Sequence, residues 1–368
     1  MALTSRTSAN ALTPKLWAKA LAAAAPQETY FSRFAGTDAN SAFQVRSELG
    51  KHAGDQLTIG LRMKLGNDGV TDGQAMQGAE EPLVFYSDAL LINELANAVS
   101  RAGIIDEQRG LDGWRQEALD GLSTWFGERL DEMLFNQLAG NTYTGVSSLR
   151  LGFNTVVGPT SNADLTLSRW ICSGIAGTGS LANEATVEGT STSILKLTDI
   201  DKAIERARMA VPRIRPIRVD GQDKYLLFIH PSQVTDIRGD TSTVGSFFDL
   251  QKAALQGGKI SDNPLYTGAL GEYNNVIIHS SAFIPNGVVS GNASQNTHVR
   301  RAVFCGAQAA AVGYGLIGGV GKYDWKEQEL DYTRTHGVMA HTICGIKKMV
   351  FNSVDYGTIV ISSYSAAH

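Results

Sequence analysis

Apolar residues at helical spacing predict one long amphipathic helix over residues 111–139. They recur every three or four positions, as residues on one helix face do: Leu111, Trp114, Ala118, Leu122 and Trp125. Further apolar residues broaden this face: Leu119, Phe126, Leu130 and Leu138. Charged residues occupy much of the remaining surface: Glu117, Asp120, Glu128, Arg129, Asp131 and Glu132. At 1.5 Å per residue the helix spans roughly 40 Å, and Gly140 follows as the residue that ends it.

A period of two predicts a long β-hairpin within residues 46–100. Apolar and polar residues alternate through Leu57, Ile59, Leu61, Met63 and Leu65, which is the spacing of a strand. Residues 66–81 are rich in turn-forming Gly, Asn and Asp, and residues 83–91 return as a second apolar run. Since an isolated hairpin is only marginally stable in water, this one needs a partner surface.

The flanking segments predict an arm, a loop-rich crossing and a second helix. Residues 1–45 form an N-terminal arm whose one short helix, residues 12–25, is stopped by Pro26. Residues 141–197 carry little periodicity and cross into another domain. A helix follows over residues 198–212, with Thr198 and Asp201 as its capping pair. Its apolar face consists of Ile200, Ile204, Ala207 and Val211.

The second half of the chain predicts mostly short strands. The expected strands are residues 225–229, 276–278, 338–351 and 356–364. Two helices are expected, from Pro231 toward Ile237 and over residues 246–255, the second ended by Gly257 and Gly258. From about residue 300 the chain is mostly β, so the whole chain is predicted to be an α+β protein.

Composition narrows the classes of function. The net charge of −4 argues against an electrostatic nucleic-acid binder. Charged residues make up 18% of the chain where about 25% is usual, which suits a subunit that covers surface against copies of itself. Three scattered cysteines, Cys172, Cys305 and Cys344, argue against a disulfide framework and fit a reducing compartment. No apolar run approaches the ~20 residues of a membrane span, so no membrane partner is expected.

Glycine motifs give the only hint of a cofactor site. Gly313, Gly315 and Gly318 match G-x-G-x-x-G, but the dinucleotide interpretation requires a helix to begin there. Gly319 and Gly321 would break such a helix, so we expect a glycine-rich connection between strands. Residues 257–259 fail the phosphate-loop pattern, since Ile260 replaces the Ser or Thr that binds magnesium.

The remaining candidate groups favour structural roles. His336 and His341 are five residues apart, which is not the spacing of a metal-ligand pair, and His230 and His279 follow strand runs where capping or core roles are expected. A basic cluster consists of Lys202, Arg206, Arg208, Arg213, Arg215 and Arg218. It could contact phosphate or an acidic partner, or it could be a solvated face, and we favour the solvated face. We expect no catalytic, cofactor-binding or metal-binding residues and no enzyme activity.

Longer strings of sequence carry a family resemblance. They are residues 80–88 (EEPLVFYSD), 135–140 (FNQLAG), 228–238 (FIHPSQVTDIR), 246–279 and 345–357 (GIKKMVFNSVDYG). In this order they resemble segments of tailed-phage major capsid proteins of the N-four-type podovirus family. The match covers most of residues 80–360, whereas the arm and residues 141–197 match poorly.

The resemblance implies the Hong Kong 97-like capsid fold. That fold has an N-terminal arm, an extended loop, a peripheral domain with a long spine helix, and an axial domain. Applied to this chain, the implied division is residues 1–45, arm; 46–100, extended loop; 101–155, peripheral domain with spine helix 111–139; 156–299, axial domain; and 300–368, a β-rich return to the peripheral domain.

The implied function is that of a major capsid protein that self-assembles into an icosahedral head around double-stranded DNA. The implied partners are hexamers and pentamers of itself, a separate scaffolding protein, a portal and non-specifically packaged DNA, with a decoration protein left open. The implied location is the virion, after assembly in the host cytoplasm. Two alternatives remain: a nucleotide-binding enzyme using residues 313–318, and a non-viral compartment shell of the same fold.

Two expectations concern the mature particle. Only about 45 residues precede the hairpin, too few for a fused scaffolding domain, so we expect no proteolytic leader. We also expect non-covalent contacts rather than a lysine–asparagine cross-link between subunits, although Lys51 and Lys64 lie on the hairpin.

Overall fold

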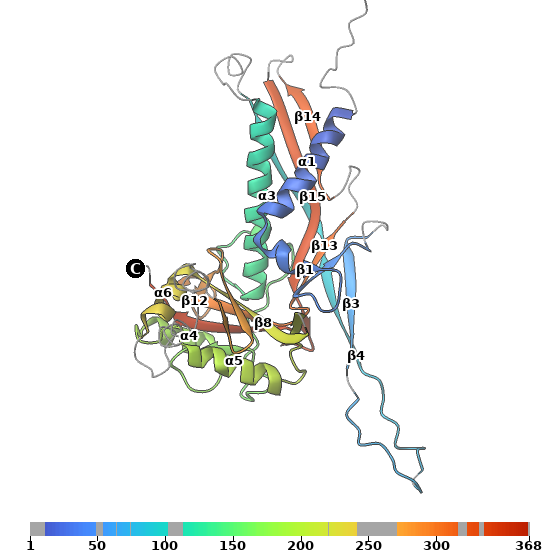
Figure 1. Ribbon diagram of the computed structural model, residues 1–368, viewed down its shortest axis with the longest axis vertical. Coiled ribbons are helices and arrows are strands. Elements are labelled where there is room, and N and C mark those ends of the chain that lie inside the picture. The colour runs from blue at the N-terminus through green and yellow to red at the C-terminus, as the bar shows by residue number, and fades with distance from the viewer. Residues whose placement is uncertain are drawn as a thin grey trace, which may run out of the picture.

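The chain forms two β-sheets joined at an angle, with a long hairpin projecting from their junction. The computed structural model describes residues 12–48, 54–63, 65–73, 75–101, 113–219, 221–240, 271–315, 322–330 and 335–366. In Figure 1 one limb carries α1 and α3 on a narrow sheet, and a wider body carries the shorter helices. The hairpin leaves the junction on the side away from α3.

The helices and strands have the following bounds. The helices are α1 (Leu12–Glu28), α3 (Trp114–Leu138), α4 (Leu181–Glu188), α5 (Leu197–Met209) and α6 (Pro231–Gly239), with 3-10 turns η1 (Tyr30–Phe34) and η3 (Ser148–Arg150). The strands of the first half are β1 (Ala35–Gly36), β2 (Phe43–Arg46), β3 (Gln56–Arg62), β4 (Phe85–Leu91), β5 (Asn93–Ser100), β6 (Trp170–Cys172), β7 (Ile217–Val219) and β8 (Gln222–Ile229). The strands of the second half are β9 (Glu272–Tyr273), β10 (Val276–Ser280), β11 (Asn286–Val288), β12 (Gln295–Cys305), β13 (Ala310–Tyr314), β14 (Asp324–Leu330), β15 (Thr335–Lys348), β16 (Val350–Phe351), β17 (Val354–Asp355) and β18 (Thr358–Tyr364).

The first sheet supports the long helix. Its order is β1-β2-β13-β15-β14, and β5 pairs antiparallel with β15 from Ser100 opposite Gly337 to Asn93 opposite Cys344. α3 packs on this sheet through a buried row that includes Leu122, Phe126 and Leu130. The predicted helix is therefore confirmed from Trp114 onward, with Ala118 and Leu122 of its predicted apolar face buried, and Gly140 follows it with a φ of 62°, as expected of a terminating glycine. Leu111 lies outside the described residues.

The second sheet carries the other helices. Its order is β6-β18-β12-β8-β10-β9, with β11 beside β12 and β7 beside β8. Ile200, Ile204 and Ala207 of α5 are buried in the core of this body, as their spacing predicted. The predicted strands at 225–229 and 276–278 and the helix from Pro231 are also confirmed.

The structure corrects several predicted boundaries. α1 continues through Pro26 to Glu28, since Thr29 donates from its amide and its hydroxyl to the carbonyl oxygen of Ala25 and so completes the last turn. α5 begins at Leu197, where the Asp199 carboxylate, not Thr198, accepts from the Lys196 amide. The loop-rich segment 141–197 contains β6 and α4, which its weak periodicity concealed.

Two segments that were each expected to form one unit contribute to different parts of the fold. Within residues 46–100 only β3 and β4 form the hairpin, because β5 pairs with β15 in the first sheet. Within residues 300–368, β13, β14 and β15 belong to the first sheet, but β12 and β18 belong to the second. Strand pairing between distant segments decides this, and hydrophobic periodicity carries no information about it. The predicted helix at 246–255 and its glycine end lie outside the described residues.

Candidate subunit interface

The hairpin changes character along its length. β3 and β4 pair from Gln56 opposite Leu91 to Arg62 opposite Phe85, and a last backbone bond joins the Met63 amide to the Val84 carbonyl at 3.0 Å. Beyond it lies the outer ribbon, residues 63–84. There the Glu81 carboxylate accepts from the amides of Gly66 and Asn67 at 2.8 to 3.0 Å, which lowers the pKa of Glu81. One carboxylate thus ties the two legs of the ribbon together.

Exposed apolar side chains concentrate on the hairpin. In the described part of the chain, thirteen large apolar side chains are exposed, and seven lie between residues 65 and 91: Leu65, Val70, Met76, Leu83, Val84, Phe85 and Leu91. Single exposed apolar residues are ordinary, but a concentration of them marks an interaction surface. The outer ribbon therefore has the composition of a surface that another molecule covers.

The base of the hairpin is fixed to the first sheet. Leu57, Ile59 and Leu90 are buried in one cluster with Met349 and Phe351. The packing is close at β15 as well, because a Cβ on Gly345 would lie against the carbonyl oxygen of Leu91.

Polar contacts reinforce this base. The Lys347 ammonium donates to Asp88 Oδ1 at 2.5 Å and to the Ala89 carbonyl at 2.8 Å. The Asn154 amide bonds both backbone groups of Leu91 at 2.8 and 3.0 Å. A rigid base determines the direction in which the ribbon projects.

A buried arginine of the second sheet, Arg301, reaches the end of α3 and is paired within its own sheet's body. Arg301 of β12 donates from Nε and Nη2 to the carboxylate of Glu184 in α4 at 2.8 and 2.6 Å, and both side chains have 0% exposure. Nη1 of Arg301 donates to the Gly140 carbonyl at 2.7 Å, which satisfies a free acceptor at the helix end. The same side chain thus holds β12, α4 and α3 together.

The arm is fixed to α3 by a carboxylate that the sequence placed on the exposed face. Asp131 has only 1% exposure and accepts from the amides of Tyr30 and Phe31 at 2.8 and 3.1 Å. Burial raises the pKa of Asp131 to about 6, and the two amide bonds oppose that rise. Periodicity could not find this contact, because its partner is a backbone 100 residues away.

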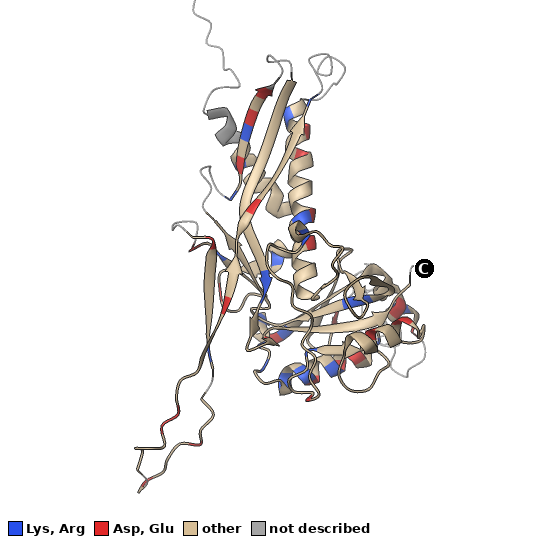
Figure 2. Cartoon of the chain, turned by 180° about the vertical axis from the view of Figure 1, so that it is seen from behind, with Lys and Arg blue, Asp and Glu red and all other residues tan. Residues whose placement is uncertain are grey.

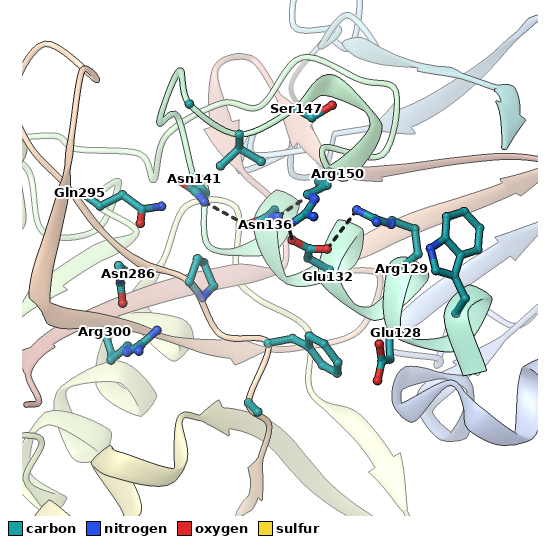
Figure 3. A pocket seen from close by; sticks show the side chains of 16 residues that line it. Glu128, Arg129, Glu132, Asn136, Asn141, Ser147, Arg150, Asn286, Gln295 and Arg300 are labelled. Carbon is teal, nitrogen blue, oxygen red and sulfur yellow. Dashed lines mark hydrogen bonds and ion pairs between the residues drawn. The ribbon is translucent and has the colours of Figure 1, made fainter. Parts of the chain in front are cut away.

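A cavity of about 770 Å³ lies where α3 meets the second sheet, between the C-terminal half of α3, residues 141–150 and residues 282–300. We call it the foot pocket. Figure 3 shows its charged groups, among which Glu132 accepts from Arg129 at 3.3 Å and from Arg150 at 3.0 Å. Arg300 donates from Nη1 to the Ile284 carbonyl at 3.1 Å. Trp125, predicted to be part of the buried face of the helix, is only partly buried and lines this pocket.

The groups singled out in the sequence have structural roles. His230 caps α6 by accepting from the Ser232 amide at 3.2 Å, and His279 stacks on Phe228, with ring centroids 5.7 Å apart. Gly313 packs against the base of the hairpin, and after Gly315 the next described element is the strand β14, so the described residues of this motif begin no helix. Residues 257–259, Lys51 and Lys64 lie outside the described residues.

Two side chains of the basic cluster bond other groups of the chain. Lys202 pairs with Asp199 at 2.9 Å, and Arg206 donates to the Trp170 carbonyl at 2.8 Å. Arg208, Arg213 and Arg215 are exposed. Val211, predicted to be on the buried face of α5, is exposed because the helix ends before it, at Met209.

The described residues contain no group of three His, Cys, Asp or Glu side chains able to hold a metal ion. Among them no helix is long and apolar enough to cross a membrane.

Comparison with known proteins places the chain in a class of shell-forming proteins. A family model described as phage capsid protein matches residues 4–367. The major capsid protein of Pseudomonas phage KPP25 is 27% identical over 363 residues, covering 92% of this chain and 91% of that protein. The capsid structure of Ralstonia phage GP4 has a TM-score of 0.74 at 29% identity and covers 92% of both chains. The capsid of cyanophage Pam1 has a TM-score of 0.73 at 22% identity and covers 93% of both chains.

These matches confirm the predicted Hong Kong 97-like fold and the predicted class of structural protein. The chain belongs to the phage capsid protein family. It is a component of a virion and assembles with copies of itself into a multimeric shell.

Proposed function

We propose that this protein is the major capsid protein that builds an icosahedral head, as hexamers and pentamers, around double-stranded DNA. The observation that carries the proposal is the outer ribbon, which exposes apolar side chains on an element with no core of its own. The similarity to the KPP25 and GP4 capsid proteins extends over 92% of the chain in both cases.

The domains of the fold follow the two sheets. The first sheet with α1 and α3 is the peripheral domain, α3 is its spine helix, and β3 and β4 with the outer ribbon are the extended loop. The second sheet with α4, α5 and α6 is the axial domain. The support for this division is that strand pairing separates the two sheets and Arg301 joins them at the end of α3.

Assembly takes place in the host cytoplasm with a separate scaffolding protein and a portal, and a decoration protein is compatible with the exposed surface. Buried thiols support a reducing compartment, since Cys172, Cys305 and Cys344 are all free and buried. Subunits are held without cross-links, because apolar burial at ~25 cal/mol per Å² is sufficient to stabilise a shell.

Negative-stain microscopy of the chain expressed alone and with its scaffolding protein tests this function. Regular closed shells of uniform diameter are expected, with nuclease-protected DNA in particles from infected cells and a single denatured band near 39.4 kDa. Shells that hold protein cargo and no DNA would instead support a non-viral compartment. A nucleotide-dependent activity in an unassembled protein would support the enzyme alternative.

A further inference from the structure

The outer ribbon is acidic as well as apolar. The outer ribbon, residues 63–84, contains four acidic residues, Asp68, Asp72, Glu80 and Glu81, and one basic residue, Lys64. Glu80 and Glu81 accept from backbone amides within the ribbon, and Asp68 and Asp72 are exposed. Figure 2 shows acidic positions along this projecting segment. A surface that covers the ribbon must therefore offer both apolar contact and positive charge.

The foot pocket offers both. Arg129, Arg150 and Arg300 line it together with Glu128 and Glu132, and Glu132 is already paired with Arg129 and Arg150. Its walls also contain apolar side chains from all three segments: Trp125, Val146, Phe283 and Pro285. The pocket thus matches the ribbon in charge and in apolar character.

Two polar atoms in the pocket lack partners. Among the described residues, Nε of Arg300 and Oδ1 of Asn286 are buried and make no hydrogen bond, although both side chains line the pocket, as Figure 3 shows. A buried polar group left unpaired destabilises the protein. Burial also lowers the pKa of Arg300, a cost that an arriving carboxylate offsets. A carboxylate of an extended acidic segment can accept from Arg300 Nε, and a backbone amide of the same segment can donate to Asn286 Oδ1.

The contact must join different copies of the chain. In Figure 1 the hairpin projects from the junction on the side away from α3, so a ribbon points away from the pocket of its own subunit. A contact between two different surfaces of identical subunits is heterologous, and it closes into a ring when the rotation between neighbours allows.

We propose that the foot pocket of one subunit receives the outer ribbon of a neighbouring copy, with Arg150 and Arg300 facing the ribbon's carboxylates. This inference rests on the proposed function, since it requires assembly, and it adds the residues that receive the ribbon. The competing receptor is the exposed edge at the end of α5, where Met209 and Val211 lie close to Arg213.

Site-directed cross-linking in assembled particles separates these receptors. The chain with Asp72→Cys and Val146→Cys is assembled, checked by microscopy and treated with a short bismaleimide. The native thiols give a low background, because all three are buried and burial raises the pKa of Cys172 and Cys344 to about 12. The matched control pairs Asp72→Cys with Val211→Cys. A ladder of linked subunits is expected from the first pair and single chains from the control.

Charge reversal gives a second, independent measurement. Arg150→Glu should lower the yield of particles by about tenfold, since it faces the ribbon with like charge. Adding Asp72→Lys to the same chain should recover most of that loss. Arg213→Glu, with the same charge change on α5, should lower the yield little and should not respond to Asp72→Lys.

The outcomes distinguish this inference from the proposed function. Particles whose linked chains come only from the Val211 pair, or from neither pair, overturn the pocket as receptor and leave the capsid function intact. Rescue of Arg213→Glu in place of Arg150→Glu does the same. Failure of the unsubstituted chain to form any shell, with its scaffolding protein present, counts against the proposed function itself.

Discussion

The base of the β3–β4 hairpin and its outer ribbon are consecutive parts of one element, yet they are stabilised in opposite ways. At the base Leu90 has 1% exposure, and Asp88 is paired with Lys347. On and beside the ribbon, Phe85 has 66% exposure and Met76 has 56%. The base is folded by contacts with other parts of the chain, whereas hydrogen bonds of the ribbon, such as those of Glu81 with Gly66 and Asn67, join its own two legs. The free energy that fixes the ribbon must therefore come from a neighbouring molecule.

Charges differ between the two regions in the same way. The folded body contains ionised groups that are buried and paired, as Arg301 with Glu184 and Lys348 with Asp355 at 2.9 Å. On the ribbon, Asp68 and Asp72 are exposed. Removing one partner of a buried pair strongly destabilises the fold, whereas exposed charges mainly affect the rate and specificity of association. Substitutions in the body should therefore change the stability of the monomer, and substitutions on the ribbon should change assembly.

The largest expected effect is on assembly. Deletion of residues 66–81 joins the two legs just beyond the Met63–Val84 bond and removes no residue buried in the described structure. We expect a monomer with an unchanged melting temperature and no closed shells, measured by thermal denaturation and microscopy. An unfolded monomer would show that the ribbon belongs to the core and would remove the contrast with the base.

The next effect is on the folded body. Glu184→Ala leaves Arg301 buried without its carboxylate, which should reduce the free energy of unfolding by about 3–5 kcal/mol. Glu272→Ala removes the more exposed partner of Lys224 and should cost about 0–1 kcal/mol. Chemical denaturation measures both. Replacing Arg301 and Glu184 together by methionine should cost less than Glu184→Ala alone, and a larger cost would show that the pair is needed beyond charge compensation.

The sequence predicted those elements that local pattern controls. α3, the apolar face of α5 and the β3–β4 alternation all have strong periodicity, and each was found in the expected place. The family resemblance supplied the order of the domains. The pairing of β5 with β15 and of β12 with β18 was not predictable, because these partners are separated by long stretches of sequence and local residues do not encode the choice.

The candidate interface was only half predictable. The turn-rich, apolar outer ribbon showed in the sequence that the hairpin needs a partner. The foot pocket could not be predicted, since Arg129, Arg150 and Arg300 come from three separate segments and look like ordinary surface charges. Asp131 and Trp125 were both misplaced for one reason: a helical wheel assumes one buried face, whereas α3 contacts the arm on one side and lines a pocket on another.

A pair of neighbouring aromatic residues on α3 sharpens the contrast between core and interface within one helix turn. Phe126 is fully buried, so Phe126→Ala should cost about 3–5 kcal/mol of unfolding free energy. Trp125→Ala should cost less in the monomer, because Trp125 is partly exposed in the foot pocket, yet it should reduce assembly. Thermal denaturation and particle yield measure the two effects. Equal losses of monomer stability would place Trp125 in the core.

The smallest expected effect is a pH dependence in the attachment of the arm. The pKa of Asp131 is raised from 3.8 to about 6, so its protonated form is favoured in the folded chain. A raised pKa means that the full contribution to stability is present below about pH 4 and is lost as the pH rises to about 6. The free energy of unfolding should therefore fall by about 3 kcal/mol over this pH range.

Asp131→Asn isolates this effect because the amide does not ionise. The variant loses one acceptor for the Tyr30 and Phe31 amides at every pH, which gives a constant cost. Its free energy of unfolding, relative to that of the unsubstituted chain, should therefore rise by about 3 kcal/mol between pH 4 and pH 7, measured by chemical denaturation at each pH. Glu128→Gln, the same change at an exposed position of α3, provides the baseline. A difference that stays constant across this range, or that falls as the pH rises, would show that Asp131 holds the arm as an ordinary ionised carboxylate.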